Sequence, residues 1–418
     1  MKMPCFILLL LIFQRGYCQD LNKRHSFATS YFGIDAIVVP QLSNSAFLNQ
    51  QGQEEVLTRS GYLTPAINIG ATHFWGHADF FISISTIPIS FTEDQLENNI
   101  RMGTMTGMRL YPWAIQNEGL RPYIGYRFAP FRLNQKNLLE ENYRRTKVKG
   151  MGELGLAWQT GAKYIYLGYH RVFNPEEDIY ICRRKTATSS YPDGFFTLGI
   201  NLSLETTRGA YSPVIRELDT LLSNKNTLGL FIGVGPSAAF PTASSDYIQR
   251  DRPVLDDLSM PNIFPDFTIG YHFSKHDVAI AANFRPMVQE RQAFGYEQRI
   301  RRNSIGVEAY KYLFDYHGFA PYLGIGYQAN FIRFQEWINE DEVKDVTSNQ
   351  SAYHLIFGWD IRPGKKGDYL LLRTNLRWTP DLEFAVNSSS VNLEFLEFNF
   401  IQVILYPQRI KKYKELRR

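Results

Sequence analysis

The sequence has 418 residues, a net charge of +4 and a mean hydropathy of −0.27. So small a charge gives no reason to expect binding to nucleic acid. Aromatic residues make up 15% of the chain, yet no segment after the first 18 residues is apolar over the length that a membrane-spanning helix needs. This combination is typical of a membrane β-barrel, in which lipid-facing residues alternate with polar ones.

Residues 1–18 have the features of a signal peptide. A positive charge at Lys2 precedes the apolar run 6–13, and small residues precede a cleavage point after Cys18. A lipid-modified Cys18 is the alternative, but the residues before it lack the usual small aliphatic pattern. Cleavage would leave Cys182 as the only cysteine, which excludes an internal disulfide. We therefore expect an exported chain that no disulfide stabilises.

Period-two alternation recurs along the rest of the chain. Segments 152–158, 196–204 and 370–378 each place Leu, Ile or aromatic residues on one face and small, polar or charged residues on the other. In the third segment the polar face includes Arg373 and Arg377. Sixteen such segments can be marked. They predict an all-β fold, a transmembrane antiparallel up-and-down β-barrel.

The connections between these segments alternate in length. Long polar connections are predicted at 41–60, 91–99, 134–149, 174–193, 242–264, 288–298, 337–349 and 381–390. Short turns are predicted at 75–79, 113–119, 160–163, 274–277, 315–318 and 364–368. Outer-membrane barrels pair long extracellular loops with short periplasmic turns in this way.

The chain repeats itself at a spacing of 199–201 residues. Residues 119–126 return as 318–327, and Trp158 returns as Trp359. Two halves of eight strands each are predicted. The expected organisation is a signal peptide at 1–18, a first half at 19–206, a periplasmic linker at 207–226, a second half at 227–407 and a basic tail at 408–418. Apolar spacing within the linker indicates a short amphipathic helix.

Each half resembles the eight-stranded outer-membrane barrel family of the OmpA, OmpX and OmpW type. Residues 321–327, Pro-Tyr-Leu-Gly-Ile-Gly-Tyr, resemble the family's fifth strand, and residues 233–241 resemble its first strand. The resemblance implies a fold and a place in the outer membrane of a Gram-negative cell, and it implies no particular activity. The chain departs from the family pattern at its end, because the basic segment 409–418 follows the last aromatic residues of the final strand.

The strands can close as two eight-stranded barrels or as one barrel of sixteen. Eight strands leave an interior that side chains fill, whereas sixteen leave an aqueous channel. A linker of about twenty residues is unusual for a turn inside one barrel, so we favour two filled barrels in tandem. The residues predicted to carry charge in the barrel interior are Arg109, Arg127, Glu153, Glu308, Asp360, Arg373, Arg377 and Glu397. Alternatively, these residues line a wide polar lumen.

No metal, cofactor or catalytic residue is predicted. The residues His73, His77 and Asp79, which return as His272, His276 and Asp277, are ligand types that zinc accepts. However, they surround predicted periplasmic turns, where polar residues are ordinary. The pair His272 and Ser274 could in principle serve a lipid hydrolase. That turn should face the periplasm, away from outer-leaflet lipid, and the motifs of hydrolases are absent.

The predicted loops carry charge, basic at 144–149 and 183–185 and acidic at 340–342. The expected partners are outer-membrane lipid and lipopolysaccharide, with a protein partner at the extracellular loops or the basic tail as a further possibility. The sequence favours a non-enzymatic structural or interaction role in the outer membrane. A porin-like channel for small solutes is the alternative, and a lipid-modifying enzyme is less well supported.

Overall fold

The computed structural model describes residues 23–25, 28–49, 51–73, 77–85, 91–93, 96–113, 118–136, 142–204, 208–210, 229–255, 262–315, 319–361 and 369–417. The predicted signal peptide and the predicted helix of the linker lie outside these residues. Among the described residues, no helix has the length and apolar character needed to cross a membrane. The regular structure is almost entirely antiparallel β-sheet, which confirms the predicted all-β barrel fold.

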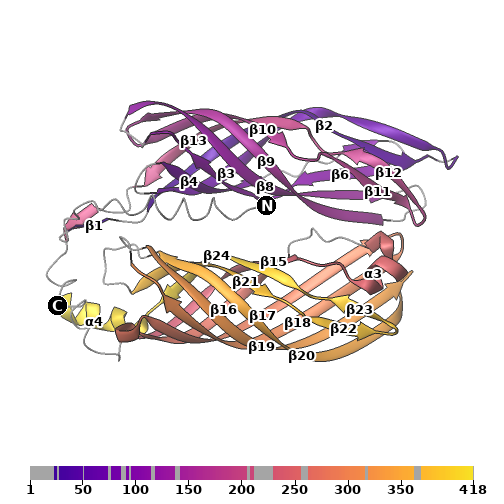
Figure 1. The fold of residues 1–418 in the computed structure, drawn as a ribbon. Helices are drawn as coiled ribbons and strands as arrows, with labels where there is room; N and C mark the ends of the chain where they lie inside the picture. Colours follow the sequence, from indigo (N-terminus) through magenta and orange to yellow (C-terminus); the bar gives the residue numbers. More distant parts are fainter. Residues whose placement is uncertain are drawn as a thin grey trace, which may run out of the picture.

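The first half forms an antiparallel ring that closes on itself (Figure 1). Its strands are β2 (Ala28–Leu48), β3 (Glu54–His73), β4 (Ala78–Ser85), β5 (Phe91–Glu93), β6 (Leu96–Met102), β7 (Met105–Leu110), β8 (Glu118–Lys136), β9 (Asn142–Thr160), β10 (Lys163–Val172), β11 (Glu176–Cys182), β12 (Lys185–Ser190) and β13 (Gly194–Leu204). Strands β6 and β7 pair with successive parts of β8 and together occupy one strand position of the ring. Strands β11 and β12 form a hairpin beyond the ring. The ring closes where β13 pairs with β2, from Phe196 opposite Val38 to Leu204 opposite Ser30.

The second half closes in the same way. Its elements are β15 (Leu230–Pro241), α3 (Asp246–Asp251), η3 (Pro253–Leu255), β16 (Asn262–Phe273), η4 (Ser274–His276), β17 (Val278–Ala293), β18 (Tyr296–Tyr312), β19 (Phe319–Ile338), β20 (Asp341–Ile361), β21 (Leu370–Thr379), β22 (Glu383–Val386), β23 (Ser389–Asn392) and β24 (Phe395–Leu405). Strand β24 pairs with β15, from Leu405 opposite Ile232 to Phe395 opposite Pro241. Closure satisfies the backbone groups that a sheet edge would expose to lipid.

The two rings lie side by side with their ends aligned (Figure 1). One end carries the long hairpins, and we call it the extracellular end. At the other end the short strands β1 (Lys23–His25) and β14 (Arg208–Ala210) pair with each other. The predicted basic tail lies at this end too, where it forms the helix α4 (Pro407–Arg417) directly after β24.

Several of the predicted long loops are instead hairpins of paired strands. In the segment predicted as a loop at 337–349, β19 continues to Ile338 and β20 begins at Asp341, with Asn339 and Glu340 at positive φ in a two-residue turn. Segments 41–60, 174–193 and 288–298 are also largely paired. The prediction of loops was wrong because both faces of a strand are solvated beyond the lipid. The apolar alternation then ends, although the backbone pairing does not.

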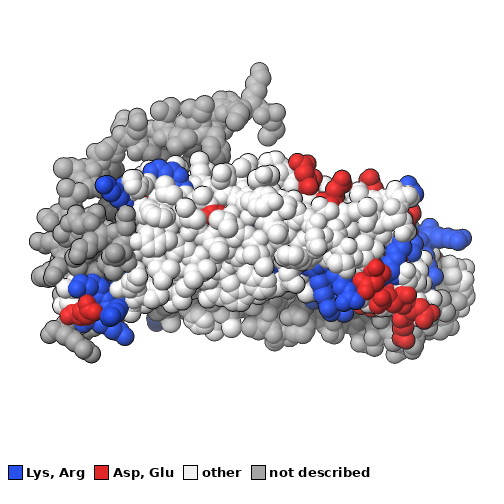
Figure 2. Space-filling model, turned by 90° about the horizontal axis from the view of Figure 1, so that it is seen from below, with Lys and Arg blue, Asp and Glu red and all other residues white. Residues whose placement is uncertain are grey.

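The exterior of the rings is apolar over the length of a bilayer crossing. On β20 the outward residues Tyr353, Leu355 and Phe357 are exposed by 73%, 54% and 46%. Figure 2 shows a broad surface almost without charged side chains, bounded at both ends by Lys, Arg, Asp and Glu. A transmembrane strand needs about 9–11 residues to cross the hydrocarbon. On β19 the exposed apolar face from Leu323 to Phe331 has this length.

Substitution of Leu355 by Arg places a charge in this apolar band. We expect it to lower the free energy of unfolding in lipid vesicles by roughly 2–4 kcal/mol, the usual cost near the bilayer midplane. The matched control is Val343→Arg on the same strand. Val343 is 44% exposed and lies beyond the band, close to the turn of the β19–β20 hairpin. Equal losses for the two variants would contradict the assignment of the band.

Candidate functional site

A carboxylate at the centre of the first ring is surrounded by cations. Glu153 of β9 accepts hydrogen bonds from Arg109 Nε at 3.1 Å, from Arg127 Nε and Nη2 at 2.7 Å each, and from the Tyr123 hydroxyl at 2.8 Å. The guanidinium of Arg109 also lies 3.8 Å from the ring centroid of Tyr166. The side chains of all three charged residues are fully buried. Such burial is tolerated because each charge is paired and hydrogen-bonded.

Two further carboxylates complete the interior of the first ring. Asp35 accepts hydrogen bonds from Ser83 Oγ at 3.0 Å and from the Tyr166 hydroxyl at 2.5 Å. Asp79 accepts hydrogen bonds from Thr72 Oγ1 at 2.5 Å and from the Tyr111 hydroxyl at 2.6 Å. Tyrosine hydroxyls therefore link the strands across the interior, and the aromatic side chains of these tyrosines fill the space between the strands.

The second ring is centred on Glu308 of β18. This carboxylate lies 2.8 Å from Arg377 Nε, 3.1 Å from Arg285 Nη1 and 3.0 Å from His354 Nε2. Arg377 extends the network, since its Nη1 donates to Asp266 Oδ2 at 2.8 Å. All of these side chains are buried.

Two more ion pairs lie in the same interior. Arg373 donates to Asp360 through Nε at 2.8 Å and Nη2 at 3.0 Å, which is a bidentate pair. Tyr312 donates its hydroxyl to the same carboxylate at 2.6 Å. Arg302 forms an ion pair with Glu397.

The buried charges balance within each ring. Over the described residues of the membrane-level interior, three arginines face three carboxylates in the first ring and four face four in the second. In the first ring they are Arg109, Arg121, Arg127, Asp35, Asp79 and Glu153, and in the second ring they are Arg285, Arg302, Arg373, Arg377, Asp266, Glu308, Asp360 and Glu397. Neither interior therefore carries an excess charge of the kind that selects ions in a pore.

All eight residues predicted as interior charges are buried in the barrels. The three of the first half meet in one cluster. The five of the second half fall into two groups: Arg285 links Glu308, with its partner Arg377, to Glu397, whereas Arg373 pairs with Asp360. Sequence reasoning missed Arg285, Arg302 and Asp266. Arg302 could have been found, because it has the same strand parity as Glu308 on β18. The tyrosines were missed because a tyrosine suits both the lipid boundary and the interior.

Glycines make these cross-strand contacts possible. In the first ring Arg109 is opposite Gly125, which is opposite Glu153. In the second ring Glu308 is opposite Gly326, which is opposite His354. A Cβ atom on Gly326 would lie 2.1 Å from His354 Nε2. The missing side chain lets two residues on alternate strands reach each other over the strand between them.

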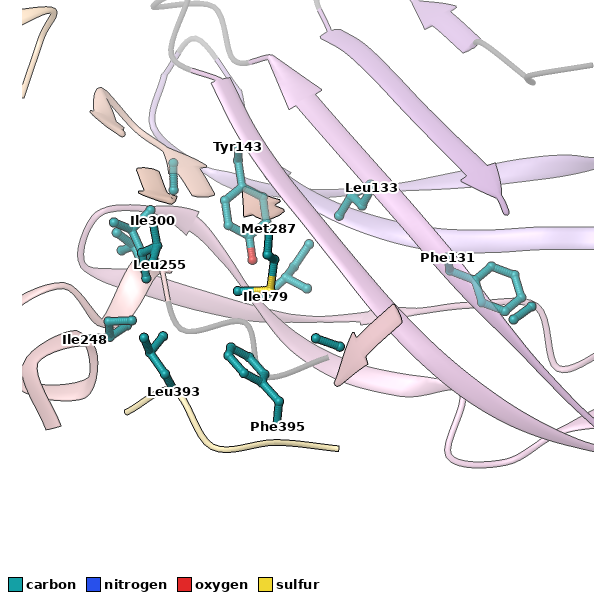
Figure 3. Close-up of a cluster of buried hydrophobic side chains, with 14 of the residues drawn as sticks. Phe131, Leu133, Tyr143, Ile179, Ile248, Leu255, Met287, Ile300, Leu393 and Phe395 are labelled. Atoms are coloured by element: carbon teal, nitrogen blue, oxygen red, sulfur yellow. The ribbon is translucent and has the colours of Figure 1, made fainter. Parts of the chain in front are cut away.

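A large apolar cluster lies in the extracellular half of the interiors, beside buried polar residues such as Gln289 and Gln298. One buried cluster contains Phe131 and Met151 of the first ring together with Met287 and Phe395 of the second. Figure 3 shows side chains of this cluster from both halves, with Tyr143 of β9 among them. Apolar packing thus occupies much of the section of each barrel beyond the ion pairs.

A lid of local structure covers the extracellular end of the second ring. Glu336 of β19, which is fully buried, accepts hydrogen bonds from the Tyr247 hydroxyl of α3 at 2.9 Å, from Arg252 Nη2 at 2.9 Å and from Gln298 Nε2 at 2.7 Å. Burial and the hydrogen bond to Glu336 raise the pKa of Tyr247. Burial lowers the pKa of Lys344, whose Nζ lies 2.5 Å from the Tyr247 oxygen. The lid is therefore held by a buried charge and its donors.

The hairpin β11–β12 of the first ring reaches the second ring. Near its tip, Arg183 Nε donates to the carbonyl oxygen of Phe294 at 2.9 Å, and its guanidinium lies 5.0 Å from the ring centroid of Tyr296. Tyr143 stacks on Phe294 with ring centroids 5.3 Å apart and pairs with Ala293 along the backbone. We call these contacts of Arg183 and Tyr143 with the β17–β18 turn the inter-barrel clasp.

A carboxylate fixes the base of the same hairpin. Glu177 of β11 forms ion pairs with three cations of β9: Arg145, Lys147 at 3.0 Å and Lys149 at 3.4 Å. The predicted basic loop at 144–149 is therefore a strand in this region, and part of its charge is used to hold the hairpin against the barrel wall. This orientation brings the tip of the hairpin to the second ring.

The described residues among those considered as zinc ligands lie in different surroundings. His77 Nδ1 lies 3.0 Å from the Tyr111 carbonyl oxygen, and Asp79 is used inside the barrel. His272 is buried beside the ring of Tyr312, whereas His276 is exposed. Within the described residues, no group of three or more His, Cys, Asp and Glu side chains could hold a metal ion. The side chain of His73 lies outside the description.

The closed antiparallel rings and their apolar exterior decide the class of protein. The chain is an outer-membrane β-barrel protein. The charged and aromatic side chains of its interior are buried, and the exposed side chains of its exterior are largely apolar. The long hairpins, the lid and the clasp all lie at the extracellular end.

Comparisons with known proteins do not extend this class. No family model matches the chain. No curated protein matches it. Among solved structures, Neisserial surface protein A is 15% identical with a TM-score of 0.31, covering 43% of this chain and 97% of its own. The N-terminal barrel of Pseudomonas aeruginosa OprF is 11% identical with a TM-score of 0.26, covering 43% and 98%. An outer-membrane channel of Pseudomonas putida F1 is 7% identical with a TM-score of 0.21, covering 93% and 99%.

Substitution of Gly326 by Ala tests the glycine bridge. The added methyl group would displace the His354 ring from Glu308, so we expect the free energy of unfolding to fall by about 1–3 kcal/mol, as for overpacked cores. Gly152→Ala is the control, since its Cβ would meet only the ring of Phe173, at 3.2 Å. Denaturant titration in micelles measures both variants. A Gly326 variant as stable as the control would contradict the proposed role of this glycine.

Loss of Arg183 tests the clasp. A protease site placed between residues 210 and 226 allows the folded protein to be cut, and we expect the halves to co-purify in mild detergent. With Arg183→Ala, which removes a charge-assisted hydrogen bond, the association of the cut halves should weaken about tenfold. Arg184→Ala, at an exposed neighbouring position, is the control. Halves of the Arg183 variant that stay together until they are boiled would show a shared ring in place of two closed ones.

Proposed function

We propose that this chain is a non-enzymatic outer-membrane protein that acts at its extracellular surface as a structural or interaction component. The observation that carries the proposal is the filled interior of both rings. At membrane level, ion pairs such as Arg109–Glu153 and Arg377–Glu308 span the lumen, and apolar side chains occupy much of the section beyond them. A barrel of this kind leaves its outer ends as the region free for binding.

The extracellular ends support the same proposal. The clasp holds the hairpin of the first ring against a turn of the second, so both rings contribute to one surface. The lid over the second ring belongs to the same end, where Ser245 and Asn392 join α3 to the β22–β23 hairpin. A protein partner or lipopolysaccharide would meet a surface whose shape the barrels fix.

We also infer that the two halves derive from one ancestral barrel by tandem duplication. The inference is supported by the shared register, in which Arg109, Gly125 and Glu153 occupy the places that Glu308, Gly326 and His354 occupy in the second ring. The interior chemistry then differs between the halves, although the strand pattern does not.

Conductance in a planar bilayer tests the proposal. The purified full-length chain should insert without stable current steps, because the paired charges and the apolar packing leave no continuous water path. An open porin measured in the same bilayer serves as the positive reference. Reproducible ohmic steps from the native chain would contradict the proposal and would support a channel for small solutes.

A further inference from the structure

An arginine with no partner among the described residues lies at the extracellular edge of the apolar band of the second ring. Arg301 of β18 is exposed on the outward face, and it has no carboxylate or other partner within the part of the chain that the structure describes. Its cross-strand neighbours are Val288 of β17, which is 52% exposed, and Arg333 of β19. One neighbour is therefore an exposed apolar residue at the edge of the lipid-facing band, and the other repeats the positive charge of Arg301.

Two like charges directly opposite each other on a sheet destabilise it unless something lies between them. Arg333 is turned away to Asp345 of β20, to which it donates through Nε at 3.0 Å and Nη2 at 2.5 Å. This pair is solvent-exposed, so its strength is modest. Of the two opposed arginines, Arg333 thus has a carboxylate partner and Arg301 has none among the described residues.

The surroundings of Arg301 fit an amphipathic ligand. Towards the membrane, the outward residues are Ile305 of β18 and Phe331 of β19, exposed by 55% and 48%. Polar groups flank the arginines, since Asn303 is opposite Phe331 and Thr347 is opposite Arg333. Cationic and hydrogen-bonding groups therefore lie directly above an apolar wall.

We propose that Arg301 and Arg333, with Asn303 and Thr347, form a binding site for the phosphate group of an outer-leaflet lipid whose acyl chains lie along Ile305 and Phe331. A guanidinium presents a planar fork of donors that matches phosphate oxygens in a bidentate geometry. The phosphate lies between the two arginines and relieves their repulsion. The apolar wall below explains why the ligand is a lipid and not a soluble phosphate.

The site predicts opposite effects for two substitutions. Arg301→Gln removes the free cation, and binding of a phosphorylated lipid should weaken about tenfold, the usual loss for one charge-assisted hydrogen bond. Asp345→Asn releases Arg333 towards the phosphate, and binding should strengthen severalfold. The fold is unaffected in both cases because the side chains lie on the outer surface.

The experiment uses the full-length protein in a neutral detergent and counts bound lipid by native mass spectrometry. The probes are lipid A with its phosphates, lipid A from which the phosphates have been removed, and inorganic phosphate. The native chain should retain only the phosphorylated lipid. Retention of both lipids alike, or displacement of the lipid by millimolar inorganic phosphate, would overturn the proposal.

Two controls separate this site from general electrostatics. Arg299→Gln removes a cation whose Nε already lies 2.7 Å from Glu290, so it should leave lipid binding unchanged. Asp341→Asn removes a negative charge at the start of β20, away from Arg333, and should not strengthen binding. Equal effects in the control and test variants would reduce the interaction to net charge and would overturn the site.

Discussion

Water cannot solvate a carboxylate or guanidinium held inside a narrow barrel, and this constraint organises both halves of the protein. Each ring meets this constraint because its buried arginines and carboxylates, counted over the described residues at membrane level, are equal in number and pair with each other or with hydrogen-bond donors. Glu153 has two arginines and a tyrosine hydroxyl around it, and Glu308 has two arginines and a histidine. Removal of one partner from such a cluster leaves an uncompensated buried charge, which costs more than the pair contributes. Each interior is therefore stable only while its set of charged partners is complete.

The rest of the fold is arranged around these sets. Strand parity directs charges inward and apolar residues towards lipid, so that one alternation satisfies two different environments. Glycines such as Gly326 open the space in which charges on alternate strands meet. Beyond the lipid the same strands continue as hairpins, because pairing satisfies their backbone groups when neither face is apolar. The barrel wall therefore determines the position of the extracellular hairpins, because the hairpins are continuations of its strands.

The sequence predicted the elements that depend on local pattern. Alternation at 196–204 and 370–378 predicted strands with the correct face inward, and parity placed Arg109 and Glu397 in the interior. It could not show which charges meet, because contacts such as that of Arg302 with Glu397 depend on ring closure. It also misread polar hairpins as loops, since composition changes at the edge of the lipid while pairing continues. The contact of Arg183 with the Phe294 carbonyl has no sequence signal, because a backbone acceptor can belong to any residue.

Equivalent register positions carry Arg109 and Glu153 in one ring and Glu308 and His354 in the other. A chain with two similar halves risks assembling a hybrid barrel from strands of both. If β18 took the place of β7, Glu308 would face Glu153 across Gly125, and two carboxylates would be buried together. If β7 took the place of β18, Arg109 would face His354 without a carboxylate. Because the interior charges differ, a strand of one half is energetically unfavourable in the other half. This difference disfavours exchange of strands between the halves during assembly, although the backbone pairing alone would permit it.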